Sequence, residues 1–149
     1  MKFGISGGSG ILSHVRAPNV FSKSRNAGSV KGDRMATTQQ HCIDACLECS
    51  KVCDMCVAAC LSEKDIDILR RCIRTTIDCA EICMAAARMM ARDSENQAEM
   101  CLVSAEICKK CEQECRKHAG MLDHCAVCAD ACARCAEVCR ALAGSPAFA

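Results

Sequence analysis

The chain has 149 residues, of which 18 are cysteine and three are phenylalanine, while tryptophan and tyrosine are absent. This length suits one domain with a single core, although the aromatic side chains that usually help to fill a core are largely missing. The formal net charge is +1, but residues 1–34 hold six of the 19 Lys and Arg and one of the 18 acidic residues, leaving 13 basic and 17 acidic residues elsewhere. That balance argues against nucleic-acid binding, and the chain lacks the apolar run of about 18 residues expected of a membrane span.

Residues 1–36 are rich in Gly, Ser, Lys and Arg and show no sustained hydrophobic period. We predict a disordered basic tail here. A leader resembling an organellar transit peptide is one alternative, and translation starting at Met35, with residues 1–34 untranslated, is another. The stretch has neither the apolar segment nor the cleavage site of a secretory signal. We therefore expect a cytoplasmic protein whose cysteines stay reduced.

A first helix is predicted from Thr38 to Leu61, because six cysteines recur along it at alternating steps of four and three residues. This 3.5-residue period places all six on one helix face, which carries leucine and isoleucine in an ordinary bundle. Thr37 or Thr38 is the expected N-cap. The six cysteines are Cys42, Cys46, Cys49, Cys53, Cys56 and Cys60.

A second helix is predicted to open at the capping-box sequence Ser62 to Asp65 and to run to Arg92. Its sulfur stripe is thinner, because Thr76 and Ala86 occupy two of the slots that the same spacing defines. Its cysteines are Cys72, Cys79 and Cys83.

A third helix is predicted to open at a second capping box, Ser94 to Gln97, and to stop at Gly120 in a left-handed C-cap. Ser104 takes one slot of its stripe, and His118 is next in step after the last cysteine. The cysteines of this helix are Cys101, Cys108, Cys111 and Cys115.

A fourth helix is predicted from Met121 to Leu142, ended by Gly144 and Pro146. Its cysteines are Cys125, Cys128, Cys132, Cys135 and Cys139. Short connections between the helices favour antiparallel neighbours. We therefore predict an all-α, up-down-up-down four-helix bundle over residues 37–143 with a cysteine-lined core, a disordered N-terminal tail and a C-terminal tail over residues 144–149.

A core of thiols suits a soft metal ion. Free cysteine packs as a small hydrophobic residue, so the bundle can fold with neutral thiols inside it. Thiolate ligands select Cu(I), which accepts two or three sulfur atoms without requiring a closed cage of four. Cysteines three or four residues apart are neighbours on a helix and can hold one ion between them. We predict that the cysteines of the core bind multiple Cu(I) ions.

Beyond the last cysteines, one end of the bundle gathers side chains that could pass Cu(I) inward: Asp65, His118, Met121 and His124. We predict that these four also act as metal ligands, at an entrance. The alternative is an ordinary polar helix end, where a histidine suits the helix dipole. The opposite end gathers Gln39, Met90, Gln97 and Leu142 and is expected to be poor in ligands.

With these repeated spacings, the chain resembles the cytosolic branch of the cysteine-rich, four-helix-bundle copper storage proteins. The resemblance covers about residues 39–142 and rests on the repeated C-x3-C and C-x2-C spacings, as in CIDACLECSKVCDMCVAAC and CAVCADACARCAEVC. It implies Cu(I) storage through cysteine thiolates with all 18 cysteines as ligands, a homotetramer, and polar entrance residues at the positions of Asp65 and His118. The basic leader and the thinner second stripe depart from the family pattern.

Four other classes remain as alternatives. Zinc or cadmium sequestration would use closed four-thiolate sites, which the uneven stripes would leave incomplete. A disulfide-stapled helical protein would normally be secreted and would place cysteines to tie elements together. A thiol redox enzyme needs an exposed thiolate of low pKa, and iron–sulfur clusters usually draw their ligands from loops. The sequence therefore favours a binding protein and not an enzyme.

Overall fold

The computed structural model describes residues 30–145, and side chains over residues 36–145. It contains four helices, α1 (Val30–Leu61), α2 (Ile66–Ala91), α3 (Gln97–Arg116) and α4 (Asp123–Ala143). None of them, within this range, offers an apolar stretch that could serve as a membrane span. Residues 1–29 of the tail predicted over residues 1–36, and the predicted stop at Pro146, lie outside the described residues.

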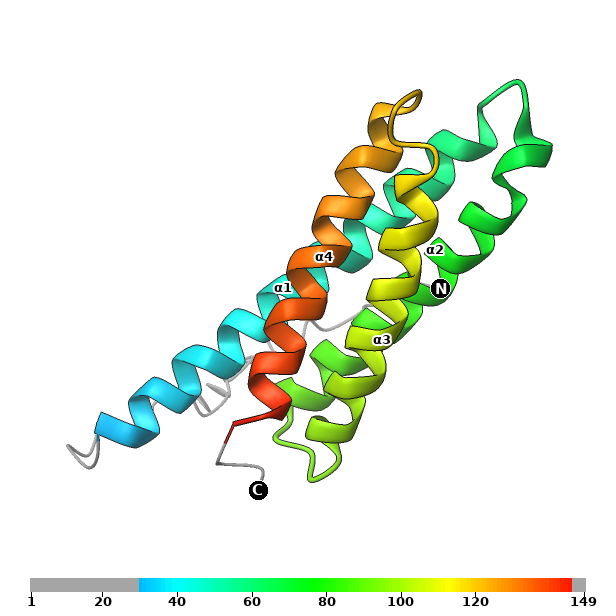
Figure 1. The fold of residues 1–149 in the computed structure, drawn as a ribbon. Coiled ribbons are helices and arrows are strands. Elements are labelled where there is room, and N and C mark those ends of the chain that lie inside the picture. Colours follow the sequence, from blue (N-terminus) through cyan, green and yellow to red (C-terminus); the bar gives the residue numbers. More distant parts are fainter. Residues whose placement is uncertain (1–29, 146–149) are drawn as a thin grey trace, which may run out of the picture.

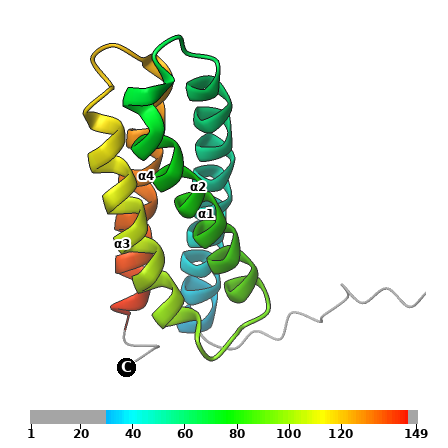
Figure 2. The same cartoon turned by 90° about the vertical axis from the view of Figure 1, so that its right-hand side faces the viewer.

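The helices form a ring in which α1 packs against α2 and α4, and α3 packs against the same two helices. Figures 1 and 2 show the chain reversing direction from each helix to the next. The sulfur contacts agree with this course: Cys60, late in α1, lies 3.9 Å from Cys125, early in α4. Cys42, in the first half of α1, lies 3.6 Å from Cys139, late in α4. The all-α four-helix bundle predicted from the sequence is confirmed.

Sulfur atoms fill most of the core. Each of the 18 cysteines is at most 1% exposed. Thr76 and Ser104 occupy two of the intervening slots and are fully buried as well. The largest fully buried side chains are those of Leu69, Met90 and Leu142, which lie toward the helix ends. The period of the cysteines gives each helix one face that is almost entirely apolar. Burial of these four faces against one another holds the helices together.

The first helix begins earlier than predicted. It starts at Val30, so the expected first residue, Thr38, and the expected N-cap at Thr37 or Thr38 lie inside it. In the structure, residues 30–36 are part of α1. The cysteine stripe fixes where α1 must be buried, but it does not fix where the helix starts, because a helix can continue into solvent where no core contact is required.

The capping box predicted at Ser62 to Asp65 is not formed in the connection between α1 and α2. Ser62 ends α1 instead of opening α2: its hydroxyl donates to the carbonyl of Ala58 at 3.1 Å, and its N–H donates to the carbonyl of Ala59 at 3.0 Å. The helix N-cap is Asp65, followed by Ile66. A serine in the last turn can bond backward to a carbonyl four residues earlier, and this competes with the forward cap.

The predicted left-handed cap at Gly120 is also wrong. No glycine among the described residues has a positive φ, and the left-handed residue is Asp93, with φ of 51°, directly after α2. α3 ends at Arg116, and the carbonyl of His118 accepts the N–H of Met121 at 3.0 Å to close the following turn. Aspartate is one of the few non-glycine residues that tolerate this region of φ.

The second predicted capping box is also not formed, because the N-cap of α3 is Asn96 and makes no side-chain capping bond, whereas the end of α4 agrees with the sequence. Ser94 begins the turn into α3, since its hydroxyl accepts the N–H of Asn96 at 3.4 Å and its carbonyl accepts the N–H of Gln97 at 3.1 Å. α4 ends at Ala143, with Gly144 as the C-cap as predicted.

The large aliphatic side chains at the bundle ends should carry a disproportionate share of the stability of the metal-free protein. We expect Leu142→Ala and Leu69→Ala each to lower the free energy of unfolding by about 2–5 kcal/mol, because both side chains are almost wholly buried. Urea unfolding of the reduced, metal-free protein, followed by circular dichroism, measures this. Leu61→Ala is the matched control, since Leu61 is 56% exposed and should cost far less. Equal losses at Leu61 and Leu142 would contradict the assignment.

Candidate metal centre

The sulfur atoms of facing helices form overlapping groups along the core. Within each group all ligand atoms lie within 4.8 Å of one another, and three of the groups consist of four buried cysteines. These three are Cys49, Cys79, Cys83 and Cys108; Cys49, Cys53, Cys79 and Cys132; and Cys53, Cys111, Cys128 and Cys132. Successive groups share two cysteines, so the sulfur atoms form a continuous array and not a set of separate cages.

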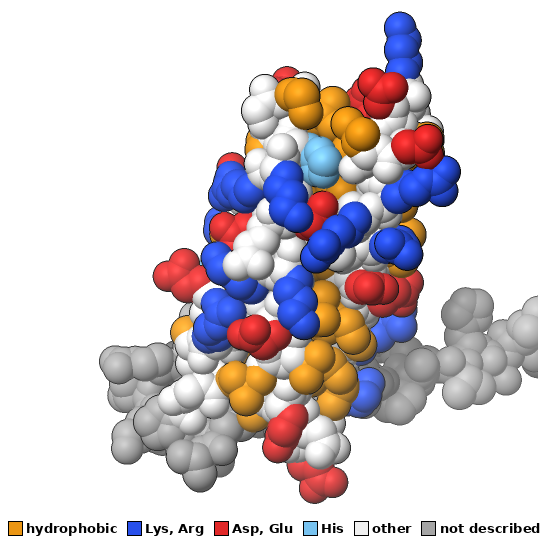
Figure 3. All heavy atoms as spheres, turned by 45° about the vertical axis from the view of Figure 1, so that its right-hand side comes forward, with side chains coloured by type: hydrophobic (Ala, Val, Ile, Leu, Met, Phe, Trp, Pro, Cys, Tyr) orange, Lys and Arg blue, Asp and Glu red, His pale blue; other side chains and the backbone are white. Residues whose placement is uncertain are grey.

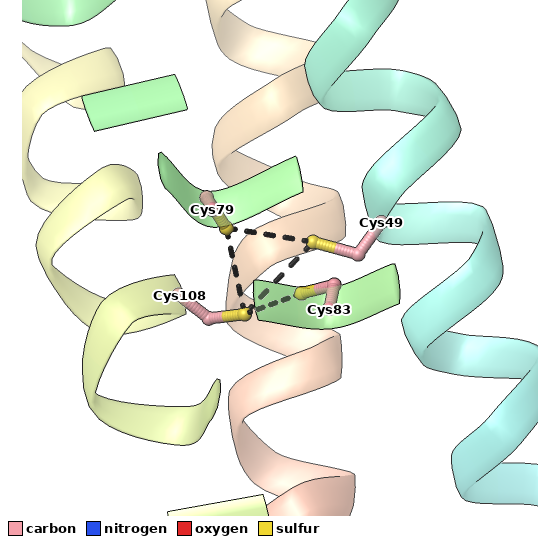
Figure 4. A group of neighbouring side chains, drawn as sticks. All are labelled: Cys49, Cys79, Cys83 and Cys108. Carbon is pink, nitrogen blue, oxygen red and sulfur yellow. Dashed lines mark hydrogen bonds between the residues drawn. The ribbon is translucent and has the colours of Figure 1, made fainter. Parts of the chain in front are cut away.

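Figure 4 shows the first of these groups, in which α1, α2 and α3 each contribute sulfur. The Sγ of Cys108 lies 3.3 Å from that of Cys83 and 3.6 Å from that of Cys79. Cys49 completes the group at 3.9 Å from Cys108 and 4.0 Å from Cys79. Two sulfur atoms bound to one metal ion at roughly 2.3 Å each lie no more than about 4.6 Å apart, so all these pairs suit a shared ion.

Pairs within one helix have the same spacing as pairs between helices. Cys111 lies 4.0 Å from Cys115, and Cys135 lies 3.9 Å from Cys139. The four-residue step therefore places two thiols of a single helix within reach of one ion, as the sequence predicted. All 18 cysteines are free in the structure.

Two hydroxyl groups replace sulfur within the array. Thr76 Oγ1 lies 3.5 Å from the Sγ of Cys111 and 3.8 Å from that of Cys115. Ser104 Oγ lies 3.6 Å from the Sγ of Cys83. A hydroxyl is a poor ligand for a soft ion, but it can donate a hydrogen bond to a neighbouring thiolate.

One end of the array joins histidine and carboxylate groups. His124 Nε2 lies 3.4 Å from the Sγ of Cys60, and both residues belong to a candidate metal group with Cys56 and Cys125. Nδ1 of the same histidine lies 4.0 Å from a carboxylate oxygen of Glu63. Of the four predicted entrance residues, His124 is thus the one whose nitrogen contacts the sulfur array.

The other three entrance residues are placed differently. His118 is 9% exposed, and its Nε2, buried and without a hydrogen-bond partner, lies 3.8 Å from Glu114 Oε1. Asp65 and Met121 are exposed, Met121 by 71%. Their role at an entrance stays a prediction.

Glu114 was missed by the sequence analysis. It is 5% exposed and forms ion pairs with Arg71 at 3.1 Å and Lys117 at 2.6 Å. It lies beside the cysteine stripe of α3 and not on it, so the periodicity gave no reason to consider it. The four-residue spacing between Glu114 and His118 was the one available signal, because that step makes two helical residues neighbours.

Burial keeps some of the thiols protonated at neutral pH. Burial raises the pKa of Cys60 to about 12, and it raises the pKa of Cys125 as well, because a thiolate is poorly solvated inside the bundle. Hydrogen bonding has a similar effect at Cys101: the bond to Cys139, followed by burial, raises the pKa of Cys101 to about 12.

Other positions favour the thiolate, because neighbouring thiols donate to them. The thiols of Cys135, Cys49 and Cys79 lower the pKa of Cys108 to about 7. The same cause lowers the pKa of Cys83, with Cys108 as its main partner. Since a thiolate is the form that binds metal, the array contains positions from which a proton leaves easily, next to positions that hold theirs.

The donor set fits soft cations. Among the described residues, sulfur is the main donor in the core. The carboxylates that adjoin the array, Glu63 and Glu114, lie at one end. Ions held by two or three thiolates with shared bridging sulfurs match overlapping groups better than isolated sites of four ligands do.

Comparison with known proteins identifies relatives of the same design. A family model described as copper storage protein matches residues 35–144. A solved structure of a cytosolic copper storage protein from Streptomyces lividans, loaded with five coppers, is 37% identical, with a TM-score of 0.74. It covers 76% of this chain and 98% of its own.

Two further relatives have similar identity. The Cu(I)-bound copper storage protein BsCsp3 is 43% identical with a TM-score of 0.68, and the match covers 72% of this chain and 99% of that one. The cysteine-rich protein YhjQ of Bacillus subtilis (strain 168) is 43% identical over 84 residues, which are 56% of this chain and 78% of that protein.

The shifted thiol pKa values predict opposite pH dependences for two alanine variants. For Cys60, whose pKa is raised to about 12, the thiol should stabilise the fold fully below about pH 9 and lose this contribution as the pH rises toward 12. The difference in unfolding free energy between wild type and Cys60→Ala should therefore shrink above about pH 9.

Cys108 is the matched contrast, since its pKa is lowered to about 7. Its contribution should be complete above about pH 9 and should decline as the pH falls through 7, so the difference between wild type and Cys108→Ala should grow from pH 7 to pH 9. Urea unfolding of the reduced, metal-free proteins across this range measures both. Parallel pH profiles for the two variants would contradict the assignment.

Proposed function

Because this chain belongs to the copper storage protein family, we propose that it stores several Cu(I) ions inside its four-helix bundle through cysteine thiolates. The observation that carries the proposal is the core of 18 buried thiols, at whose centre three overlapping groups of four cysteines each share two members with the next. Storage means that Cu(I) is bound and later released, without a catalytic step.

Cu(I) is the ion that this array suits best. Each bound ion replaces thiol protons: a sulfur–hydrogen bond breaks, a sulfur–copper bond forms, and the proton leaves to solvent with no change in oxidation state. One Cu(I) and one thiolate together are neutral, so many such pairs can lie side by side in a core that would not tolerate isolated charges. The mixture of low and high thiol pKa values supports stepwise loading.

Zinc or cadmium sequestration is the second candidate, and one observation speaks against it. Zinc favours closed tetrahedral sites with four ligands of their own. Here Cys49, Cys53, Cys79 and Cys132 each belong to two groups, so neighbouring groups cannot all close at once without sharing ligands. A redox enzyme is disfavoured because none of the 18 thiols is more than 1% exposed.

Cu(I) entrance is proposed at the end that holds His124 and His118. The contact between His124 and Cys60 supports this, since it joins a surface-accessible imidazole to the first thiols of the array. The unpaired, buried Nε2 of His118 beside Glu114 supports it as well. Figure 3 shows a histidine side chain reaching the surface near this end, between hydrophobic and charged side chains. Asp65 and Met121 would then make the outermost contacts with the incoming ion.

Cytoplasmic location and a homotetramer complete the proposal. The relative from Streptomyces lividans is described as cytosolic, and reduced thiols require a reducing compartment. Exposed apolar side chains support association between copies: Ile68 is 58% exposed, Leu102 53% and Val103 47%. Figure 3 shows hydrophobic side chains gathered low on one face of the bundle.

Anaerobic titration of the reduced protein with Cu(I), against a competing chelator, tests storage directly. We expect a capacity between about nine and about 18 ions per chain, the lower figure for two separate thiolates per ion and the higher for full bridging. Replacing Cys49, Cys53 and Cys56 by serine should reduce this capacity, whereas Met55→Ser, at a 64% exposed position of the same helix, should not. An unaltered copper count in the triple variant, or saturation by Zn(II) in sites of four sulfurs, would sink the proposal.

Entrance at the histidine end predicts a kinetic effect without a loss of capacity. The double variant Asp65→Ala, His118→Ala should take up Cu(I) several times more slowly and reach the same final count, because these side chains pass ions inward without storing them. Stopped-flow absorbance of the copper–thiolate bands measures the rate. His41→Ala, an exposed histidine on the first half of α1, is the matched control. Equal uptake rates in the double variant and the wild type would contradict an entrance at this end.

A further inference from the structure

The end of the bundle away from the histidines brings together one sulfur atom from each helix. The thiol of Cys101 in α3 donates to Sδ of Met90 in α2, with the sulfur atoms 3.6 Å apart. Cys42 of α1 lies 3.6 Å from Cys139 of α4. Cys139 in turn lies 3.8 Å from the hydroxyl of Ser104 in α3, which is one stripe position after Cys101. All four sulfur-bearing side chains are 0% exposed. This end therefore brings a thioether next to the last cysteines of the array.

Met90 occupies the stripe position at which the spacing of α2 places its next sulfur atom. Steps of three and four residues from Cys83 pass through Ala86 and reach Met90. The other three helices fill the same layer with cysteine. Met90 is thus the member of the layer whose sulfur has no proton to lose.

Contacts with α1 hold this part of α2 in place. Gln39 Nε2 donates to the carbonyl of Met90 at 2.7 Å and to Oδ1 of Asp93 at 2.9 Å. The N–H of Asp93 donates to the same carbonyl at 3.1 Å. With its backbone fixed between two donors, the thioether is presented to Cys101 in the structure without any ion.

We propose that Met90 is a thioether ligand of one stored Cu(I) ion, which it shares with Cys101 and with Cys42 or Cys139. This site rests on the proposed storage function and adds a donor of a different chemical class. Thioether and thiolate are both soft donors that select Cu(I). The hydrogen bond from Cys101 to Met90 already places the two sulfur atoms for such a site. The ion takes the place of the proton between Cys101 Sγ and Met90 Sδ, this proton and the proton of the second thiol ligand leave to solvent, and no electron is transferred.

Sulfur separation supports this geometry. Metal–sulfur bonds of roughly 2.3 Å allow two ligands of one ion to lie up to about 4.6 Å apart, and the 3.6 Å between Met90 and Cys101 falls within this limit. A thioether ligand carries no proton, so an ion bound here displaces fewer protons than an ion bound by the same number of thiols. Copper at this end is therefore held with a weaker dependence on pH than copper in the middle of the array.

Labelling with methionine that carries 13C in its methyl group tests the site, because Cu(I) is diamagnetic and each methyl group gives a separate NMR signal. Met90→Leu assigns the Met90 signal by its disappearance and roughly preserves side-chain volume. The signal of Met100 is the matched control, since Met100 precedes Cys101 in the chain and packs against the core half-buried. The labelled, reduced full chain is titrated anaerobically with Cu(I) while bound copper is counted in parallel.

We expect the Met90 methyl signal to move at full loading by several times the displacement of the Met100 signal, and Cys101→Ala to reduce that displacement to the level of Met100. Met90→Leu should give up about one ion per chain to a chelator that leaves wild type loaded. Full copper loading with equal displacements of Met90 and Met100 would overturn this site and leave storage intact. Failure to bind copper at all would overturn storage, and this site with it.

Discussion

Sulfur has to serve this protein as both core and ligand. A thiol that is protonated packs as a small apolar group, and the same thiol without its proton binds a soft ion. Adjacent sulfur atoms across the bundle lie 3.3 Å to 4.0 Å apart, close enough to pack and close enough to share an ion. Three features of the described residues leave room for sulfur to do both. Small residues lie between the cysteines, the large aliphatic side chains lie at the ends of the bundle, and the core contains no aromatic side chain.

Donor chemistry changes along the bundle axis. Imidazole and carboxylate groups join the array near Cys60, thiols alone fill most of the middle, and a thioether closes the far end at Met90. Thr76 and Ser104 introduce hydroxyl groups between these regions, in slots where a cysteine would have continued the stripe. Soft donors thus increase inward from the end where a hydrated ion would first meet nitrogen and oxygen ligands.

The cysteine period was enough to predict the helices, their buried faces and the bundle, because each of the four segments repeats the same pattern and each can bury only that face. It failed at the helix ends. The start of α1 at Val30, the hydroxyl bond of Ser62 and the left-handed backbone of Asp93 are local features that the spacing of buried residues does not determine. The cysteine period also gave no sign of Glu114, a buried carboxylate that pairs with Arg71 and Lys117 and lies off the stripe. His124 was recognised because it lies at the polar end of the bundle, directly before Cys125, but its contact with Cys60 required the structure.

Protonated thiols have an effect that reaches beyond the core. If each Cu(I) replaces a single proton, the loaded chain keeps the formal net charge of +1 that the empty chain has. If an ion takes two thiolates of its own, the chain loses one positive charge for each ion bound. The isoelectric point of the loaded protein therefore reports how many thiolates each ion uses. In the bridged arrangement, neither a charged surface nor an ion-exchange resin can distinguish a full chain from an empty one by charge alone.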